Sequence, residues 1–161
     1  MDFKAILGLG NEGVKYKNTY HNVGQLMIDF LTKSDIFTKT AILAKNQGFM
    51  NESGTSAMKI FKKIGNKPEL LLVIHDDSDI FIGKFKLTIN QSSAGHKGIQ
   101  DIINKLGTKN FWRLRIGIRP LEEKGKRMKA EEFVLKKIKK EDLEIINKVF
   151  AESLSAITKE K

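Results

Sequence analysis

The feature that most constrains this chain is an unbroken apolar run at residues 70–74, followed at once by His75-Asp76-Asp77. Consecutive apolar residues without polar alternation are typical of a strand buried on both faces, as in parallel sheets covered by helices. Residues 3–9 form a second short apolar run, ended by Gly8 and Gly10. Both runs therefore predict buried strands.

The rest of the chain alternates between segments of helical and of strand character. Apolar residues at helical spacing predict helices at 22–31, 53–64, 97–106 and about 141–159. Strands are predicted at 41–44, 84–89 and 112–118, and a basic polar loop at 125–130. Because no linker or repeat interrupts this order, we expect a single three-layer α/β domain over residues 1–161, with a mixed central sheet flanked by helices.

Length and composition exclude several classes of protein. The chain has 161 residues, 40% of them hydrophobic, which suits one compact core without covalent staples. It has no cysteine, so disulfides and thiolate metal sites are excluded. No apolar run approaches membrane-spanning length, and the apolar start is too short for a signal peptide. We therefore expect a cytoplasmic protein with no membrane partner.

The positive charge of the chain is concentrated in one region. The net charge is +10, and residues 84–140 contain 16 Lys or Arg against 5 Asp or Glu. A basic surface of this kind attracts a polyanion such as RNA. The alternative is a lysine-rich surface that is merely solvated.

The glycine-rich segment Gly8-Leu9-Gly10-Asn11-Glu12-Gly13 fits the G-x-G-x-x-G fingerprint of dinucleotide-binding proteins. That fingerprint requires a helix that starts within the loop, and an acidic residue at the end of a second strand about 20 residues further on. Residues 14–21 are polar and lack helical periodicity, and Asp35 lies in a polar stretch. The context therefore disfavours a nucleotide site.

The three histidines, His21, His75 and His96, each lie in a polar, turn-rich segment beside a hydrophobic run. Catalytic groups often lie at such loop ends on a rigid scaffold. A histidine titrates near neutrality, so a nearby carboxylate such as Asp76 can make it a proton acceptor. The alternative for His21, which precedes a predicted helix, is a capping role or none.

Collinear motifs across most of the chain resemble bacterial-type peptidyl-tRNA hydrolases. The matching segments, in order, are Gly8-Leu9-Gly10-Asn11, His21-Asn22-Val23-Gly24, Phe49-Met50-Asn51-Glu52-Ser53-Gly54, His75-Asp76-Asp77, Gly95-His96-Lys97-Gly98, Phe111 through Ile118 and Phe133-Val134-Leu135. The resemblance implies a metal-independent and cofactor-free enzyme that cleaves the ester joining a peptide to tRNA. It also implies a monomer whose partner is peptidyl-tRNA, bound through its acceptor arm and nascent peptide.

The resemblance assigns chemical roles to three residues. His21 would be the general base that takes a proton from the attacking water, and Asp76 would hold the imidazole and stabilise its charged form. Asn11 would contact the substrate near the reacting centre, where an amide can both donate and accept. The alternative for Asn11 is a turn residue between glycines.

The resemblance also implies a substrate-binding cleft. Asn51 would bind the peptide or the terminal nucleotide, and Phe49 and Tyr16 would line the same cleft. The alternatives are a cap on the helix that starts at Ser53 for Asn51, and ordinary core positions for the two aromatic residues. We expect His75 to be structural, ending the central strand, and we expect no metal at the acidic cluster that begins with Asp76.

The basic region contains the expected tRNA contacts. Lys86, Arg113, Arg115 and Lys124 fall on segments that the family places near the acceptor arm of tRNA. Phosphate contacts supply affinity without sequence preference. Lys97 stands where the family has a substrate-binding asparagine. Because a lysine is disfavoured at a helix start, it is expected to bind a phosphate; the alternative is an exposed lysine of little consequence.

Three further departures from the family concern segments around the expected site. Glu12 stands where the family usually has proline, which predicts a less rigid loop, and Tyr20 replaces an arginine before His21. Residues 32–48 are too short for the family's usual hairpin, so the sheet is expected to lose a strand or two. We predict an active, divergent peptidyl-tRNA hydrolase; the alternative is a non-catalytic RNA-binding relative of the same fold.

Overall fold

The buried apolar runs lie at the centre of a mixed sheet. In residues 2–121 and 127–158, the part of the chain that the computed structural model describes, five strands pair in the order β2-β1-β3-β5-β4. β1, β2, β3 and β5 run parallel, and β4 is antiparallel to β5 at one edge. The strands are β1 (Ala5–Gly8), β2 (Ile42–Lys45), β3 (Leu71–Phe81), β4 (Phe85–Ile89) and β5 (Trp112–Arg119).

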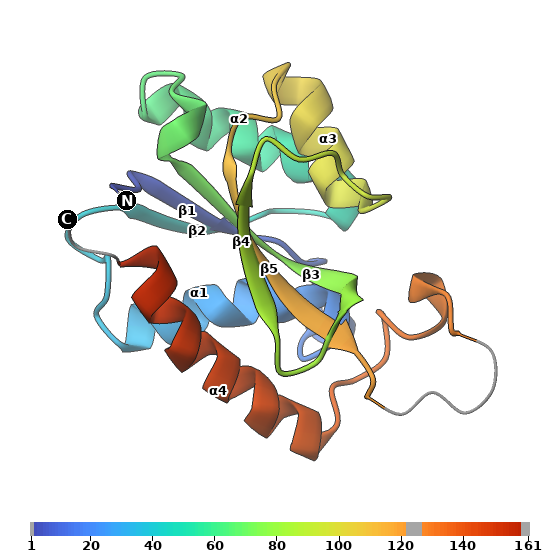
Figure 1. Cartoon of the computed structure of the whole chain (residues 1–161). Helices are drawn as coiled ribbons and strands as arrows, with labels where there is room; N and C mark the ends of the chain where they lie inside the picture. The colour runs from blue at the N-terminus through green and yellow to red at the C-terminus, as the bar shows by residue number, and fades with distance from the viewer. Residues whose placement is uncertain (1, 122–126, 159–161) are drawn as a thin grey trace.

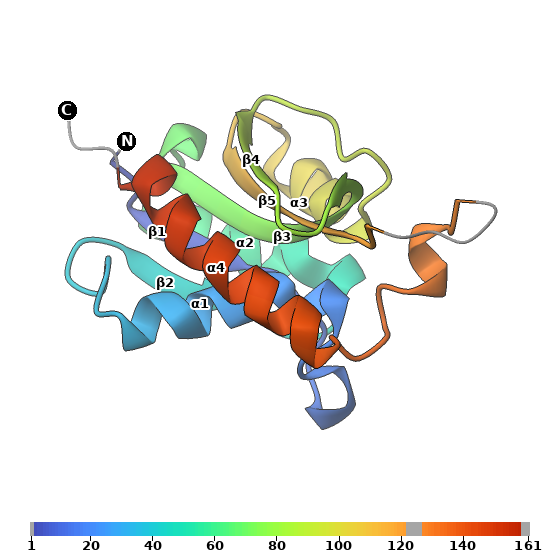
Figure 2. The same cartoon turned by 60° about the horizontal axis from the view of Figure 1, so that its bottom comes forward.

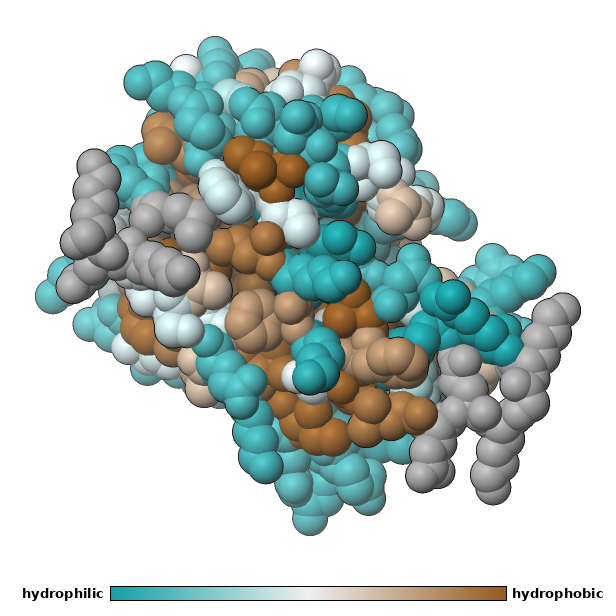
Figure 3. Space-filling model, in the orientation of Figure 1, coloured by the Kyte–Doolittle hydropathy of each residue, from teal (hydrophilic) through white to brown (hydrophobic). Residues whose placement is uncertain are grey.

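Helices cover both faces of this sheet and complete three layers (Figures 1 and 2). α1 (Val23–Lys33) and α4 (Lys140–Ile157) pack on one face, over a core that includes Ile6, Leu114 and Phe150. α2 (Ser53–Lys63) and α3 (Lys97–Leu106) cover the other face. Figure 3 shows apolar surface along the seam between β4 and α4, with hydrophilic side chains around it. The predicted α/β class, mixed sheet and flanking helices are confirmed.

The central strand is longer than its apolar run. We predicted a strand at 70–74 that His75 ends, but β3 continues to Phe81. His75, Asp76 and Asp77 keep the parallel register with β5, and the register shifts only between Asp77 and Phe81. The prediction was wrong because hydrophobicity marks only side chains buried in the core. The polar half of β3 is stabilised by backbone pairing and by partners that are remote in sequence.

Two glycines bring α1 close to the sheet. A Cβ at Gly24 would lie 2.2 Å from the carbonyl oxygen of Ile74, and a Cβ at Gly8 would lie 2.2 Å from the carbonyl oxygen of Gly24. The backbone N–H of Gln25 can therefore donate to the carbonyl oxygen of Leu9 at 3.1 Å. This close approach fixes the start of α1, and with it His21, against the ends of β1 and β3.

The glycine-rich loop does not lead into an α-helix. The first helical turn after it is a short 3₁₀ segment, Val14–Tyr16, and α1 begins only at Val23. The amides that would hold a pyrophosphate in a dinucleotide fold are therefore not presented by this loop. The helices of the described chain also include none that is long and apolar enough to cross a membrane.

We predict that Gly24→Ala destabilises the fold by about 2 kcal/mol or more, because backbone atoms must move to admit the methyl group. The free energy of unfolding from denaturant titration measures this loss. Ser155→Ala, on the exposed face of α4, is the control and should stay within about 0.5 kcal/mol of the parent chain. Equal stability of the two variants would contradict the close approach of α1.

Candidate functional site

A cleft of about 610 Å³ opens beside the polar half of β3, between the loop after β1 and the start of α3. β1 has β2 on one side and β3 on the other, so the strand order reverses here. Ligands of open α/β sheets bind at such points. Six of the residues that were assigned a catalytic or binding role from the sequence line this cleft: Asn11, His21, Phe49, Asn51, Asp76 and Lys97.

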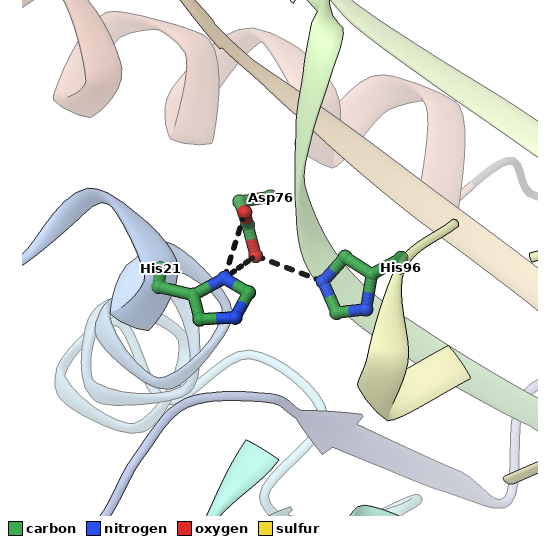
Figure 4. Close-up of side chains that lie close together, drawn as sticks. All are labelled: His21, Asp76 and His96. Carbon is green, nitrogen blue, oxygen red and sulfur yellow. Dashed lines mark hydrogen bonds and ion pairs between the residues drawn. The ribbon is translucent and has the colours of Figure 1, made fainter. Parts of the chain in front are cut away.

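The carboxylate of Asp76 joins two imidazoles at the floor of the cleft (Figure 4). Nδ1 of His21 lies 2.9 Å from both carboxylate oxygens, and Nε2 of His96 lies 3.0 Å from Oδ1. Asp76 is 2% exposed, so these partners are what compensates its burial. His21 lies in the turn before α1, and Asp76 lies on β3. His96 is itself the N-cap residue of α3.

Electrostatics keep Asp76 ionised and make His21 more basic. Burial opposes the charge on Asp76, but the two imidazoles outweigh it and hold the pKa of the carboxyl well below its usual range. Burial likewise acts to lower the pKa of His21, and Lys97 adds to that effect, yet the Asp76 carboxylate raises this pKa above its ordinary value. The pair is therefore an ionised carboxylate beside an imidazole that accepts a proton readily.

The protonation pattern follows from these contacts. An ionised carboxylate only accepts hydrogen bonds, so the Nδ1 of His21 that faces it carries the proton. Nε2 is then the lone-pair nitrogen, and Figure 4 shows it on the side of the ring away from Asp76. In the described chain it has no hydrogen-bond partner, so it is free to take a proton from a bound molecule.

His96 is the site residue that sequence reasoning missed. Its Nδ1 accepts the backbone N–H of Ile99 at 3.3 Å, which leaves the proton on Nε2, toward Asp76. The sequence offered one signal, a histidine in a polar segment between Gly95 and Lys97. Sequence spacing alone does not show that it meets a carboxylate twenty residues away on another element.

His75 packs against the ring of His96 and stays neutral. Burial, and next the proximity of His96, lower the pKa of His75 well below its ordinary value. Its Nδ1 lies 2.7 Å from the carbonyl oxygen of Asp76 and its ring packs 4.6 Å from that of His96. These contacts suit a supporting residue, although His75 does not end the strand as we expected.

Two asparagine amides clamp the loop that carries Asn11. The side chain of Asn22 accepts from the backbone N–H of Asn11 and donates to its carbonyl oxygen, both at 2.9 Å. Asn46 bonds the backbone of Gly10 in the same reciprocal way. The Oδ1 of Asn11 accepts the backbone N–H of Met50 at 2.7 Å, which leaves Nδ2 without a partner in the described chain. Asn11 therefore presents an oriented N–H donor at the cleft.

The other cleft residues differ in how they are held. Asn51 is exposed within a short 3₁₀ turn, and α2 is capped at Glu52 without a side-chain bond, so Asn51 is not a helix cap. Phe49 is 53% exposed and is no core residue. Tyr16 is absent from the lining of the cleft and instead packs edge-on against Phe49, with ring centroids 6.3 Å apart.

The predicted tRNA contacts are dispersed. Lys97 is exposed at the cleft and the first residue of α3. Lys86 is exposed on β4 directly across from Arg115, whose Nε and Nη2 each lie 2.7 Å from Asp77. Arg113 is 2% exposed, so our expectation that it contacts phosphate was wrong.

Lys124 lies outside the described residues, and so does the start of the predicted loop at 125–130.

Within residues 2–121 and 127–158, His21, Asp76 and His96 form a group whose ligand atoms could hold a metal ion. One ligand atom from each lies within 4.8 Å of the others. Both imidazole nitrogens, however, point at the carboxylate as hydrogen-bond donors, as in a histidine–carboxylate pair. The absence of a metal requirement stays a prediction.

Comparison with known proteins identifies the family. The sequence profile of the family described as peptidyl-tRNA hydrolase matches residues 5–160. The chain belongs to the peptidyl-tRNA hydrolase family. The peptidyl-tRNA hydrolase of Sulfurihydrogenibium sp. is 39% identical, over 96% of this chain and 88% of the relative. That of Aquifex aeolicus is 34% identical, over 98% and 89%. The crystal structure of peptidyl-tRNA hydrolase from Acinetobacter baumannii superposes with a TM-score of 0.84 at 27% identity, over 98% and 87% of the two chains.

This chain departs from the peptidyl-tRNA hydrolase family pattern at Glu12 and Tyr20, and both residues form hydrogen bonds to other segments. At the proline position, Glu12 donates its backbone N–H to the carbonyl oxygen of Gly48 at 3.0 Å, and its carboxylate accepts the N–H of Gly48 at 2.8 Å. Tyr20, at the arginine position, donates its hydroxyl to Asp142 at the start of α4. Burial and the adjacent carboxylate of Asp142 raise the pKa of Tyr20 to about 12, so the hydroxyl keeps its proton.

We predict that the pKa of His21, followed by NMR through its ring Cε1–H, lies above its ordinary value of 6.5. In Asp76→Asn the charge is lost while burial remains, so the pKa should fall below 6.5. Asp79→Asn, an exposed carboxylate on the same strand paired with Arg127, is the matched control and should leave the titration unchanged. A midpoint insensitive to Asp76 would contradict the coupling.

Proposed function

We propose that this chain hydrolyses the ester bond between the peptide and the tRNA of peptidyl-tRNA, so that the tRNA is recycled for translation. One observation carries the proposal: the buried carboxylate of Asp76 orients the His21 imidazole in an open cleft and raises its pKa. Membership of the peptidyl-tRNA hydrolase family supports the same reaction.

In the proposed mechanism His21 is the general base. Its Nε2 takes a proton from a water molecule as the water oxygen attacks the ester carbonyl, while Asp76 stabilises the imidazolium that forms. When the tetrahedral intermediate collapses, the bond to the ribose oxygen breaks and the imidazolium returns its proton to that oxygen. The second bond of Asp76, to His96, keeps the carboxylate in place throughout this cycle.

We propose that the peptide is recognised by three residues that line the cleft: Asn11, Asn51 and Phe49. The free Nδ2 of Asn11 donates to a carbonyl oxygen of the peptidyl group, which helps to distinguish peptidyl from free aminoacyl ends. Asn51 bonds the peptide backbone or the terminal nucleotide. Phe49 gives apolar contact at the mouth of the cleft, and Tyr16 supports its ring from behind.

The tRNA is proposed to bind through phosphates. Lys97 lies on the cleft rim, next to the reacting ester, and Lys86 and Arg115 are neighbours across β4 and β5. Asp77 fixes the guanidinium of Arg115, which leaves some of its five N–H groups for a phosphate. Lys124 belongs to this proposal by sequence position alone. Such contacts carry no base preference, which suits an enzyme that accepts many tRNAs.

The working form is proposed to be a monomeric, single-domain enzyme in the cytoplasm that needs no metal and no cofactor. The complete reaction uses only protein groups and water, since His21 both removes and returns the proton. The basic balance of the chain, +10, suits a polyanionic substrate.

Release of a blocked amino acid or peptide from tRNA tests the function. His21→Ala should lower kcat/KM by about 10²–10⁴-fold, the usual contribution of a positioned base. Thermal unfolding of both proteins checks that the substitution does not act by lowering stability. Equal release by both proteins would refute the role of His21. RNA binding with no ester cleavage by the parent chain would instead establish the non-catalytic alternative.

Lys97→Ala should weaken binding to tRNA and lower the slope of log Kd against log salt by about one, because one phosphate contact is lost. Lys105→Ala is the matched control, an exposed lysine in the last turn of the same helix, paired with Asp101. If both variants keep the parental salt slope, Lys97 contacts no phosphate.

A further inference from the structure

We propose that Asn46 is a positioning residue for Asn11, through the backbone of the loop after β1. Asn46 follows β2 directly and is 3% exposed, with no place in the lining of the main cleft. The inference rests on the proposed function, because the position of Asn11 matters only if that residue meets the substrate.

Asn46 extends the pairing of β1 and β2 beyond both strands. Its backbone N–H donates to the carbonyl oxygen of Gly8 at 3.1 Å, which continues the parallel ladder. Its side chain then pairs with Gly10, accepting from the N–H and donating to the carbonyl oxygen, both at 2.8 Å. One amide thus satisfies both backbone polar groups of the residue before Asn11, as a neighbouring strand would.

The amide of Asn46 is itself held in one orientation. Nε2 of Gln25, on α1, donates to its Oδ1 at 3.0 Å and to its carbonyl oxygen at 3.2 Å. Because an amide nitrogen cannot accept that bond, Asn46 cannot flip. The loop has no space to shift toward α1, since a Cβ on Gly10 would lie 2.8 Å from side-chain carbons of Asn22 and Gln25.

This clamp sets where Asn11 can place its free donor. Asn11 is bonded through its backbone to Asn22 and through its Oδ1 to Met50. Without Asn46, both backbone polar groups of Gly10 lose their hydrogen-bond partner, so the residue directly before Asn11 is held less firmly. A catalytic or binding group must stay within about 0.5 Å of its working position, so a looser loop reduces recognition. The clamp also restrains a loop in which Glu12 replaces a rigid proline.

A double-mutant cycle tests the inference. Asn46→Ala, Asn11→Ala and the double variant are compared by kcat/KM for peptidyl-tRNA. Asn46→Ala should lower kcat/KM about tenfold or more, since a displacement of roughly 1 Å can cost 10²-fold. If Asn46 acts through Asn11, its removal from the Asn11→Ala protein should add less than about twofold, because the two effects are not additive. Full additivity overturns the proposal.

Two further variants separate positioning from stability. Ser56→Ala is the matched control: Ser56 is 7% exposed and accepts the N–H of Gln47, next to Asn46, but contacts neither Gly10 nor Asn11. It should leave kcat/KM unchanged. Should Asn46→Ala fail to fold, Gln25→Ala takes its place in the cycle, because it leaves the amide of Asn46 present and removes the donor that fixes its orientation.

Hydrogen exchange gives a readout besides activity. The backbone amides of Gly10 and Asn11 should exchange faster in the Asn46 variant, whereas those of β3 should keep parental protection. Unchanged protection at Gly10 and Asn11 overturns the inference. If Asn11→Ala itself has parental activity, the proposed role of Asn11 fails, which is a different result from additivity in the cycle.

Discussion

The buried carboxylate of Asp76 is the interaction on which the site depends. A charge that is 2% exposed is costly unless it is paired and hydrogen-bonded. Here it accepts from His21 and His96, which come from the turn before α1 and from the start of α3. The need to satisfy one carboxylate therefore brings three elements to one point, and the same field makes His21 a better base.

The second constraint is the placement of backbone close to backbone. Gly8 and Gly24 let α1 approach β1, and this brings Asn22 and Gln25 within reach of the loop after β1. Side-chain amides then take the hydrogen-bonding role that a neighbouring strand would otherwise have. Where this chain differs from the family pattern, Glu12 bonds the backbone of Gly48 and Tyr20 bonds Asp142.

Prediction from the sequence succeeded where periodicity reports burial, and failed where the reason for burial is a distant partner. The strand at 112–118 was predicted from alternation and lies at Trp112–Arg119. The same alternation could not show that Arg113 is buried while Arg115 reaches Asp77. The polar half of β3 looked like a loop because His75, Asp76 and Asp77 are not apolar, yet β5 supplies their backbone partners. Tyr16 was assigned to the cleft wall, but it packs edge-on against Phe49 and is not among the residues that line the cleft.

The sequence by itself determined the α/β class, the order of helices and strands, and the identity of His21, Asp76 and Asn11 as candidates, because hydrophobic periodicity and motif order are properties of the linear chain. Only the tertiary structure decided that His96 shares the carboxylate with His21, and that Asn46 clamps the loop of Asn11. The physical reason is that hydrogen bonds and ion pairs act over about 3 Å in space. Residues twenty to sixty positions apart come that close only after the sheet has paired and the helices have packed on it.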